Sequence, residues 1–296
     1  MRLPRHHRHQ HHRHRIAVSW LSIALFSTLV SGCKEPIVGS SVVYDPVAGQ
    51  ALYFGGASCA SPATSNLATA SNYICAQPCN GKDIEFIDAQ GHSSDTSSIP
   101  PPSNFQCCAL DSNTSQMLCI GGVAALDLLY RFDVRKSMWI PPVSVPNGLA
   151  QRSGHSCAVS KGFFYVLGGI SLGGFDVSVP FYSFNVGTQA FTSMPTPPFA
   201  NRYGHQLVTL PDGNLFVGFG ALVSSSTSLL DSWTFNVITQ SWASLPTTNS
   251  LSIADGSSCT PWSSSANSVG GVFCFGGVTT SVVEAVLAEA VILAVA

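Results

Sequence analysis

An apolar strand that runs into a pair of glycines recurs along this chain, and this repeat limits the possible folds more than any other feature. Four copies are intact, and they end in Gly55-Gly56, Gly121-Gly122, Gly168-Gly169 and Gly276-Gly277. A fifth copy, from Phe216 to Ala221, is degenerate. With Gly220 counted as its first glycine, the copies are spaced by 66, 47, 52 and 56 residues. A period near 50 residues predicts a repeat protein in which each unit packs against its neighbours.

Two further elements accompany the glycine pairs in a fixed order. Before the pair, two units carry arginine-x-glycine-histidine, ending in His155 and His205. After the pair, an aromatic-x-Phe-Asp/Asn strand leads to a second aromatic residue, which is Trp139, Phe191 or Trp242 in three of the units. Recurring aromatics fill gaps between stacked sheets, and Asp or Asn at a strand end starts a turn. We therefore expect Trp139 and Trp242 to be buried and both histidines to make structural hydrogen bonds.

These three elements together resemble kelch repeats, over roughly residues 40–277. The resemblance implies an all-β, kelch-type β-propeller, in which every unit is a four-stranded antiparallel blade. About five blades are expected within residues 33–280. The apolar tail, residues 281–296, is expected to form a strand of the last blade or a short helix.

The fifth blade has no obvious fourth strand, and two explanations are open. Residues 35–39 could supply that strand and close a small ring. Otherwise the propeller is an incomplete, open ring from a truncated or degenerate gene, with an exposed strand edge of the kind that proteins usually avoid.

The N-terminus predicts export. Residues 1–15 hold five arginines and six histidines, and an uncharged apolar run follows from Ile16 to Val30. This pattern is typical of a secretory signal peptide over residues 1–32. A signal anchor is the alternative, although a membrane span needs about 20 apolar residues. Cys33 follows small residues as in a bacterial lipobox, which makes it a candidate lipidation site. The chain is therefore expected to be secreted or on the cell surface, as a lipoprotein if it is bacterial.

The charge of the body excludes one class of partner. After residue 15 the chain has eight Lys and Arg against fifteen Asp and Glu, a net charge of −7. Nucleic-acid binding needs a basic surface, so no nucleic-acid partner is expected.

Ten cysteines in an exported chain predict disulfides. The repeat alignment places Cys108 and Cys119, and likewise Cys259 and Cys274, on adjacent strands, so these two pairs are expected. Cys107 competes for Cys119, and buried free thiols are the alternative. Cys157 supports this alternative, because its blade has no cysteine on the second strand. A second candidate group lies in a blade-one insertion and contains Cys59, Cys75 and Cys79. Asn113 begins an Asn-Thr-Ser sequence and is a candidate N-glycosylation site.

No catalytic, metal or cofactor site is predicted. The kelch-type copper oxidases need a Tyr-His pair among their ligands, and this chain has no Tyr-His dipeptide. Outside the leader the only histidines are His92, His155 and His205.

The leading hypothesis is a non-enzymatic extracellular module that binds a protein or a glycan through the loops of its blades. Tyr73 and Trp262 are expected in such loops and are candidate ligand contacts, although either could be packed. The alternatives are an extracellular kelch-type oxidoreductase or sugar-modifying enzyme, and a truncated or degenerate kelch protein.

Overall fold

The computed structural model divides the chain into two units, residues 1–36 and residues 37–296. It describes a set of ranges within the second unit: 37–38, 41–45, 47, 50–54, 57–58, 73–78, 85–88, 106–122, 127–136, 138–171, 178–246, 258–263, 270–275 and 291–295. Every regular element in these ranges is a β-strand. Accordingly, they contain no helix that is long and apolar enough to cross a membrane.

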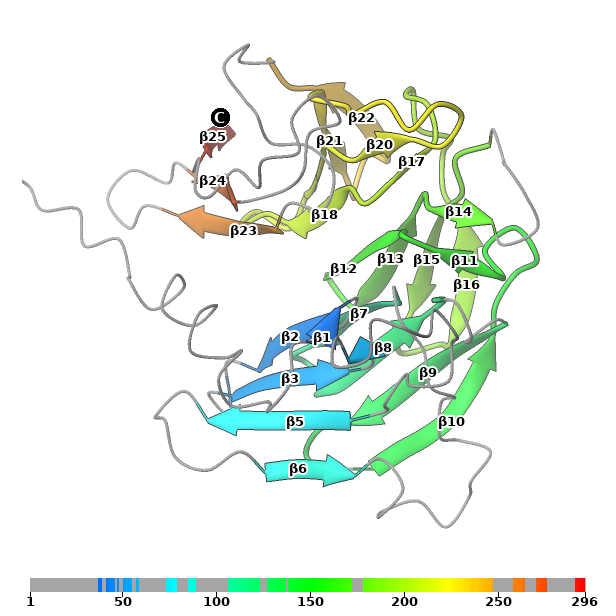
Figure 1. Cartoon of the computed structure of the whole chain (residues 1–296), viewed down its shortest axis with the longest axis vertical. Coiled ribbons are helices and arrows are strands. Elements are labelled where there is room, and N and C mark those ends of the chain that lie inside the picture. The colour runs from blue at the N-terminus through cyan, green and yellow to red at the C-terminus, as the bar shows by residue number, and fades with distance from the viewer. Residues whose placement is uncertain are drawn as a thin grey trace, which may run out of the picture. The chain divides into compact units, whose positions relative to one another are not determined.

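The strands form five successive antiparallel blades, as the resemblance implied (Figure 1). Blade one contains β2 (Ser41–Asp45), β3 (Gln50–Phe54), β5 (Tyr73–Pro78) and β6 (Glu85–Asp88). Blade two contains β7 (Cys107–Asp111), β8 (Gln116–Ile120), β9 (Leu128–Asp133) and β10 (Met138–Ser144). Blade three contains β12 (Ser156–Ser160), β13 (Phe163–Leu167), β15 (Phe181–Asn185) and β16 (Ala190–Ser193). Blade four contains β18 (Gln206–Thr209), β19 (Leu215–Gly218), β21 (Ser232–Asn236) and β22 (Ser241–Ser244).

Blade five has three described strands, β23 (Ser258–Ser263), β24 (Gly270–Phe275) and β25 (Val291–Val295). The strand β25 pairs with β24, which places part of the apolar tail in the last blade.

Short two-stranded sheets extend three of the repeats. They pair β1 (Ile37–Val38) with β4 (Ala57–Ser58), β11 (Arg152–Ser153) with β14 (Ile170–Ser171), and β17 (Arg202–Tyr203) with β20 (Ala221–Leu222). In each repeat, the segment before the first strand pairs with the segment after the glycine pair. The hypothesis that residues 35–39 supply the fourth strand of blade five is therefore wrong for Ile37 and Val38, which pair inside their own repeat.

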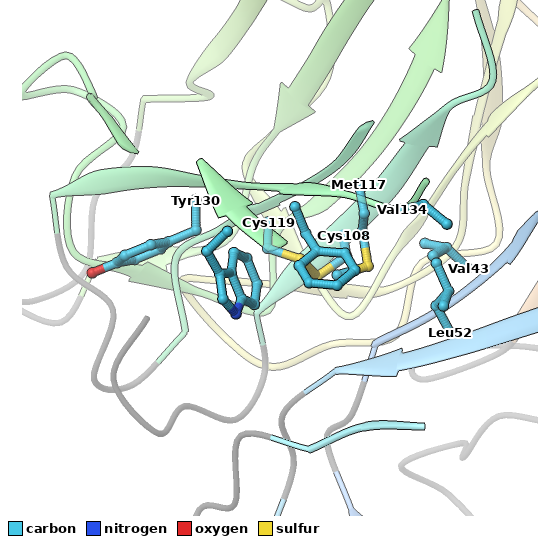
Figure 2. Packing of buried hydrophobic residues seen from close by; sticks show 9 residues of the cluster. Val43, Leu52, Cys108, Met117, Cys119, Tyr130 and Val134 are labelled. Atoms are coloured by element: carbon cyan, nitrogen blue, oxygen red, sulfur yellow. A yellow bond between two sulfur atoms is a disulfide. The ribbon is translucent and has the colours of Figure 1, made fainter. Parts of the chain in front are cut away.

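The hydrophobic core lies between blades rather than inside them. One buried cluster combines Val43 and Leu52 of blade one with Met117, Tyr130 and other residues of blade two (Figure 2). Three further clusters join blade two to three, three to four, and four to five. This arrangement follows from strand geometry, because successive side chains point to opposite faces of a blade. On β8, for example, Met117 packs toward blade one and Leu118 packs toward blade three.

The aromatic residues expected between blades occupy one repeat position. Trp139, Phe191 and Trp242 pair directly with Phe132, Phe184 and Phe235 on the neighbouring strand of their blades. Trp139 is 2% exposed, whereas Trp242 is only partly buried. Trp242 nevertheless packs on Phe181 of blade three, with ring centroids 5.3 Å apart. Both tryptophans therefore contribute to the seams between blades.

The first strands of consecutive blades, from β2 through β7, β12 and β18 to β23, are in contact. We call the end of the blades where each fourth strand leads into the next blade the crossover end, and the opposite end the turn end. At the turn end, tight turns join strands one and two and strands three and four. Asp133, Asn185 and Asn236 start three of them by accepting hydrogen bonds from backbone N–H groups two or three residues ahead. Such Asx turns are the expected use of Asp and Asn at a strand end.

Candidate functional site

The arginine-x-glycine-histidine element lies at the seams between blades, near the crossover end. His155 of blade three is buried, and its Nε2 is 3.1 Å from the carbonyl oxygen of Ile120 in blade two. The carbonyl of Arg152 accepts a hydrogen bond from Gly122 of blade two at 2.8 Å. The buried Arg152 guanidinium donates to the carbonyls of Gly148 and Gly169. Each of these groups satisfies backbone that the seam would otherwise leave unpaired.

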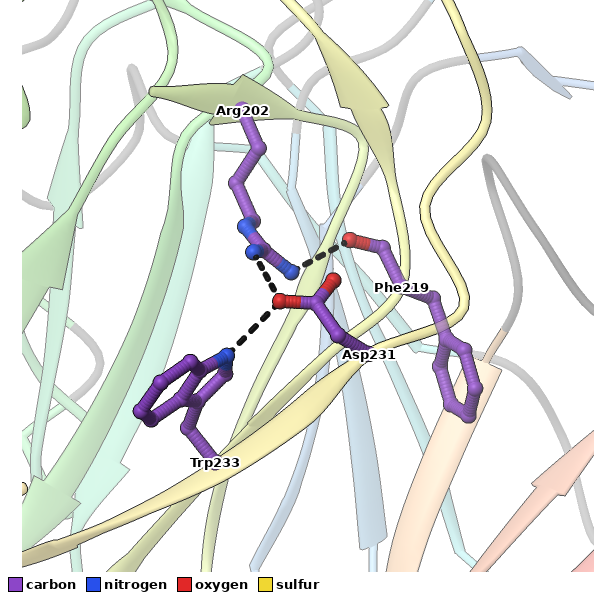
Figure 3. Close-up of polar contacts among 4 residues, drawn as sticks. All are labelled: Arg202, Phe219, Asp231 and Trp233. Carbon is purple, nitrogen blue, oxygen red and sulfur yellow. Dashed lines mark hydrogen bonds and ion pairs between the residues drawn. The ribbon is translucent and has the colours of Figure 1, made fainter. Parts of the chain in front are cut away.

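In blade four the arginine of this element is paired with a carboxylate from elsewhere in the blade (Figure 3). Arg202 is buried, and its Nη2 donates to Oδ2 of Asp231 at 2.8 Å. Its Nη1 donates to the carbonyl of Phe219, and Trp233 Nε1 donates to the same oxygen of Asp231 at 2.7 Å. Burial opposes ionisation of Asp231, but the Arg202 and Trp233 hydrogen bonds outweigh it, so the pKa of this carboxyl lies below its ordinary value.

Both seam histidines are held neutral. Burial, opposed only in part by the hydrogen bond to Ile120, lowers the pKa of His155 to about 4. Burial and the positive charge of Arg202 lower the pKa of His205 to about 3. The His155 ring supports the backbone of blade two through its contact with Ile120. Neither buried ring is placed to exchange protons with a substrate.

The seam histidines explain the glycine pairs. A Cβ atom on Gly121 would lie 2.2 Å from Cε1 of His155, and one on Gly168 would lie 2.7 Å from Cε1 of His205. Gly121 and Gly168 also have φ angles of 69° and 70°. Gly121 and Gly168 are thus needed both for their positive φ and for the close approach of the histidine of the next blade.

Blade four departs from this rule in a consistent way. Strand pairing aligns Gly220 with the second glycine, Gly169, so Phe219 occupies the place of the first glycine with a φ of 65°. This corrects the repeat spacing, in which Gly220 counts as the first glycine. The next blade has Ser257 where His155 and His205 stand in theirs. Phe219 is fully buried and belongs to the cluster between blades four and five. A large residue is therefore tolerated where the facing blade has no histidine.

One position on the first strand links successive blades by three different chemistries. Cys107 forms a disulfide with Cys157 of blade three. The equivalent residue of blade three, Ser156, donates to the carbonyl of His205 in blade four. The equivalent residue of blade four, Gln206, accepts from the N–H of Cys259 in blade five at 3.4 Å. The seam between blades two and three is therefore closed covalently.

Two further disulfides lie within blades. Cys108 is bonded to Cys119 and Cys259 to Cys274, which are the two pairs expected from the sequence. Each pair joins directly opposed residues on strands one and two, with Cα atoms 4.2 and 4.1 Å apart. The alternative prediction of free thiols is wrong for these four residues, and for Cys157 as well. Cys107 does not compete for Cys119, because neighbouring residues on a strand face opposite sides.

Several predicted residues do not take part in any described site. Gly55, Gly56, Gly276, Gly277, Cys33, Cys59, Cys79 and His92 lie outside the described residues. Cys75 is on β5. Tyr73 and Trp262, expected as ligand contacts on loops, lie in β5 and β23 instead. Within the described ranges, no three His, Cys, Asp or Glu side chains are grouped so that they could hold a metal ion.

A polar pocket at the crossover end is the best candidate for a binding site. It has a volume of about 520 Å³ and lies where blade two leads into blade three. Its lining comes from the start of β9, the end of β10, the following loop and β14: Asp127, Leu128, Ser144, Val145, Asn147, Ala150, Gln151 and Ser171. A volume of this order suits a small ligand or a short segment of a partner.

A bulge in β10 builds one wall of this pocket. The register between β9 and β10 shifts between Ile140 and Val143, where two residues of β10 stand opposite one residue of β9. The strand β10 has seven residues, whereas the equivalent β16 and β22 have four. Pro141 and Pro142 form this one-residue bulge, and an edge strand accommodates both prolines. Arg131 fixes the bulge by donating twice to the carbonyl of Pro141, at 2.7 and 3.2 Å. The longer strand carries Ser144 to the rim of the pocket.

The loop after β10 is well anchored. Val145 donates to the carbonyl of Asp127, and Leu149 donates to the carbonyl of Pro146. The Leu149 side chain is 2% exposed in the cluster between blades two and three. A Cβ atom on Gly148 would lie 2.7 Å from the hydroxyl of Tyr182, so the loop rests closely on blade three. The pocket is therefore formed before any partner binds, which lowers the entropic cost of association.

Two pocket residues differ from their equivalents in other blades. Asp127 corresponds to Val179 and Leu230, which are apolar. Gln151 corresponds to Asn201, which is buried and donates to the carbonyl of Gly169. Gln151 is instead exposed, with a φ of 54°, an uncommon conformation for a residue other than glycine. The sequence analysis missed these two residues because it compared the features that the repeats share. A comparison of the positions at which blade two differs from the other blades could have found them.

The fold and the seam contacts together define a β-propeller of kelch repeats. The family model described as the KLHDC2/KLHL20/DRC7 Kelch-repeats domain matches residues 46–277, and the chain belongs to this family. A kelch-repeat domain indicates a protein-interaction module. Comparison with curated proteins gives no match.

Proposed function

We propose that this chain is a non-enzymatic, extracellular binding module whose partner is a protein that docks at the crossover end, over the pocket between blades two and three. The observation that carries the proposal is the pocket itself. It is preformed, and it is lined by residues that the kelch repeat does not require. The side chains of Asp127, Asn147 and Gln151 are exposed, and no described residue hydrogen-bonds to them.

The extracellular location is supported by the disulfides. Six cysteines are paired in three disulfides among the described residues. Structural disulfides persist in oxidising compartments and are rare in the cytosol. This agrees with the leader that the sequence predicts.

The residues that the repeat holds in common do not favour an enzyme. His155 and His205 are buried and neutral at the seams, and six of the described cysteines are occupied in disulfides. The described lining of the pocket has hydroxyl, amide and carboxylate groups but no histidine, lysine or cysteine. Binding is the function that these groups support best.

Site-specific photo-crosslinking tests the proposal. The exported chain is prepared with benzoylphenylalanine in place of Asn147 at the pocket, or in place of Thr239 at the turn end. Both side chains are exposed, so neither replacement should affect folding. We expect defined protein adducts from native extracellular material with the Asn147 probe and none with the Thr239 probe. Equal labelling from both ends, or labelling of neither, would contradict the proposal.

A further inference from the structure

The charged and polar groups of the pocket define the chemistry of its ligand. Asp127 is the only ionisable residue among the lining residues that the structure describes. Its carboxylate is exposed, and among the described residues none donates a hydrogen bond or forms an ion pair with it. Its backbone carbonyl, in contrast, is held by Val145. The backbone of Asp127 is therefore held in place, while its carboxylate oxygens are accessible to a ligand.

The neighbouring polar groups extend this acceptor site. Ser144, Asn147 and Gln151 contribute side-chain oxygens around the same pocket, and all three residues are exposed. The nearest arginine in sequence, Arg152, is buried and directs its guanidinium to the Gly148 and Gly169 carbonyls. In the described part of the lining there is no basic side chain. A carboxylate surrounded by neutral oxygens suits a cation with several N–H donors.

The rest of the lining disfavours the other ligand classes. An anionic ligand would meet Asp127 without a compensating cation. A sugar ring usually packs its apolar face on an aromatic side chain, and the described residues that line the pocket include none. The body of the chain, with a net charge of −7 after residue 15, would also attract a basic partner from a distance.

We infer that the pocket between blades two and three binds an arginine or lysine side chain of the partner, with Asp127 as its counter-ion. This inference rests on the proposed function, because it names the group that the docked protein inserts. A guanidinium is the better fit, since its planar donors can bond the carboxylate and a neighbouring oxygen together.

Binding of short peptides to the exported chain tests the inference. Three blocked peptides of sequence Gly-Ser-Xaa-Ser-Gly carry arginine, citrulline or glutamate at Xaa. Citrulline has the shape of arginine without its charge. We expect the arginine peptide to bind at least about tenfold more tightly than the citrulline peptide in an NMR titration at low salt, and the glutamate peptide not to bind. Asp127→Asn should abolish the preference for arginine.

A matched variant controls for net charge. Asp212→Asn makes the same charge change at the turn end, where Asp212 is exposed and its Oδ1 accepts from the N–H of Asn214. Asparagine keeps that acceptor and loses only the exposed hydrogen bond that Asn214 Nδ2 donates to Oδ2 of Asp212, so the variant should fold and retain the arginine preference. Equal affinity for arginine and citrulline, or an unchanged preference in Asp127→Asn, would overturn the inference. So would a neutral oligosaccharide that displaces the peptide and binds Asp127→Asn equally well.

Failure of this inference is distinguishable from failure of the proposed function. If the Asn147 probe captures a protein but the peptides show no charge preference, the module binds a protein through this pocket by another group, and only the inference fails. If the Asn147 probe captures nothing more than the Thr239 probe, the proposed function fails, whatever the peptides show.

Discussion

At the scale of single residues, Gly168 of a glycine pair has no room for a larger side chain. We predict that Gly168→Ala lowers the free energy of unfolding by more than about 2 kcal/mol. The new Cβ would lie 2.7 Å from the ring of His205 and 2.8 Å from the carbonyl of Arg202. A φ of 70° adds backbone strain of about 1–3 kcal/mol. Urea unfolding monitored by fluorescence would measure the loss.

Gly162 provides the control for this experiment. Its φ is 80°, yet a Cβ there would meet no atom within 4 Å. Gly162→Ala should therefore show the backbone strain without the clash, and it should be clearly less destabilising than Gly168→Ala. Equal losses for the two variants would mean that the histidine contact contributes nothing.

The buried histidines predict a dependence of stability on pH. The pKa values of His155 and His205 are about 4 and about 3 in the folded chain, against an ordinary value of 6.5. Between pH 6.5 and pH 4 the unfolded chain therefore binds protons that the folded chain does not, and stability falls as the pH falls. We expect a loss of about 2 kcal/mol for each histidine between pH 7 and pH 5.

A single substitution isolates this effect. Gln106 stands in blade two at the repeat position of His155 and is buried there, so glutamine is compatible with this position in the seam. His155→Gln should reduce the slope of stability against pH by about half, measured by urea unfolding at several pH values. An unchanged slope would show that folding does not lower the pKa of His155.

The sequence reveals these residues because they recur, but it does not reveal their partners. The positions of Gly168 and His205 are predictable from the pattern. That one contacts the other across a seam is not, since the two residues belong to different repeats. Asp127 and Gln151 cannot be predicted in this way. They differ from the residues at the same repeat position in other blades, so a comparison of shared residues does not identify the pocket that they line.

At the scale of elements, the aromatic at the start of the fourth strand stabilises the seams. We predict that Trp139→Ala lowers the free energy of unfolding by about 3–5 kcal/mol, because this side chain is 2% exposed and packs on Phe132 and Tyr130. Trp242→Ala should be less destabilising, since Trp242 is only partly buried. Trp139→Phe is the conservative control, because Phe191 fills this place in blade three. Thermal melts would rank the variants, and a larger loss for Trp242 would contradict the prediction.

The disulfides test the blade connections directly. We predict that digestion without reduction yields a fragment containing Cys107 joined to one containing Cys157. Replacing both residues with serine should cost about 4 kcal/mol, against about 3 kcal/mol for Cys108 and Cys119, because the first bond spans 50 residues and the second 11. A free thiol at Cys157 in exported protein would contradict this connectivity.

The bond between Cys107 and Cys157 also shows what an alignment of blades misses. Cys108, Cys119, Cys259 and Cys274 are paired correctly from the sequence because each pair sits on adjacent strands of one blade. Cys157 lacks such a neighbour, so the sequence suggests a free thiol. Its partner faces it from the first strand of the preceding blade, which depends on how the blades stack rather than on either repeat alone.

At the scale of the whole molecule, the order of blades is predictable from the sequence, whereas the pocket is not. The repeat spacing predicts the blades, because every blade must bury its two faces against its neighbours. The pocket depends on the two prolines that lengthen β10 and on the loop that follows this strand in blade two. A feature present once carries no periodic signal, and its meaning emerges only when Asp127, Asn147 and Gln151 are placed together.

If the chain is exported, its signal peptide should be removed, and the intact mass of the secreted protein tests this prediction. The basic stretch and apolar run predict cleavage near Gly32, so the recovered chain should lack residues 1–32. Recovery of a chain that still carries Met1 would contradict the predicted signal peptide.

In a glycosylating host we also expect one added glycan at Asn113, which is exposed in the turn between β7 and β8. Asn113→Gln should remove that mass without affecting peptide binding, because the turn end lies opposite the crossover end that holds the pocket. Loss of arginine-peptide binding in Asn113→Gln would indicate a binding surface at the turn end, which contradicts the assignment of the pocket at the crossover end.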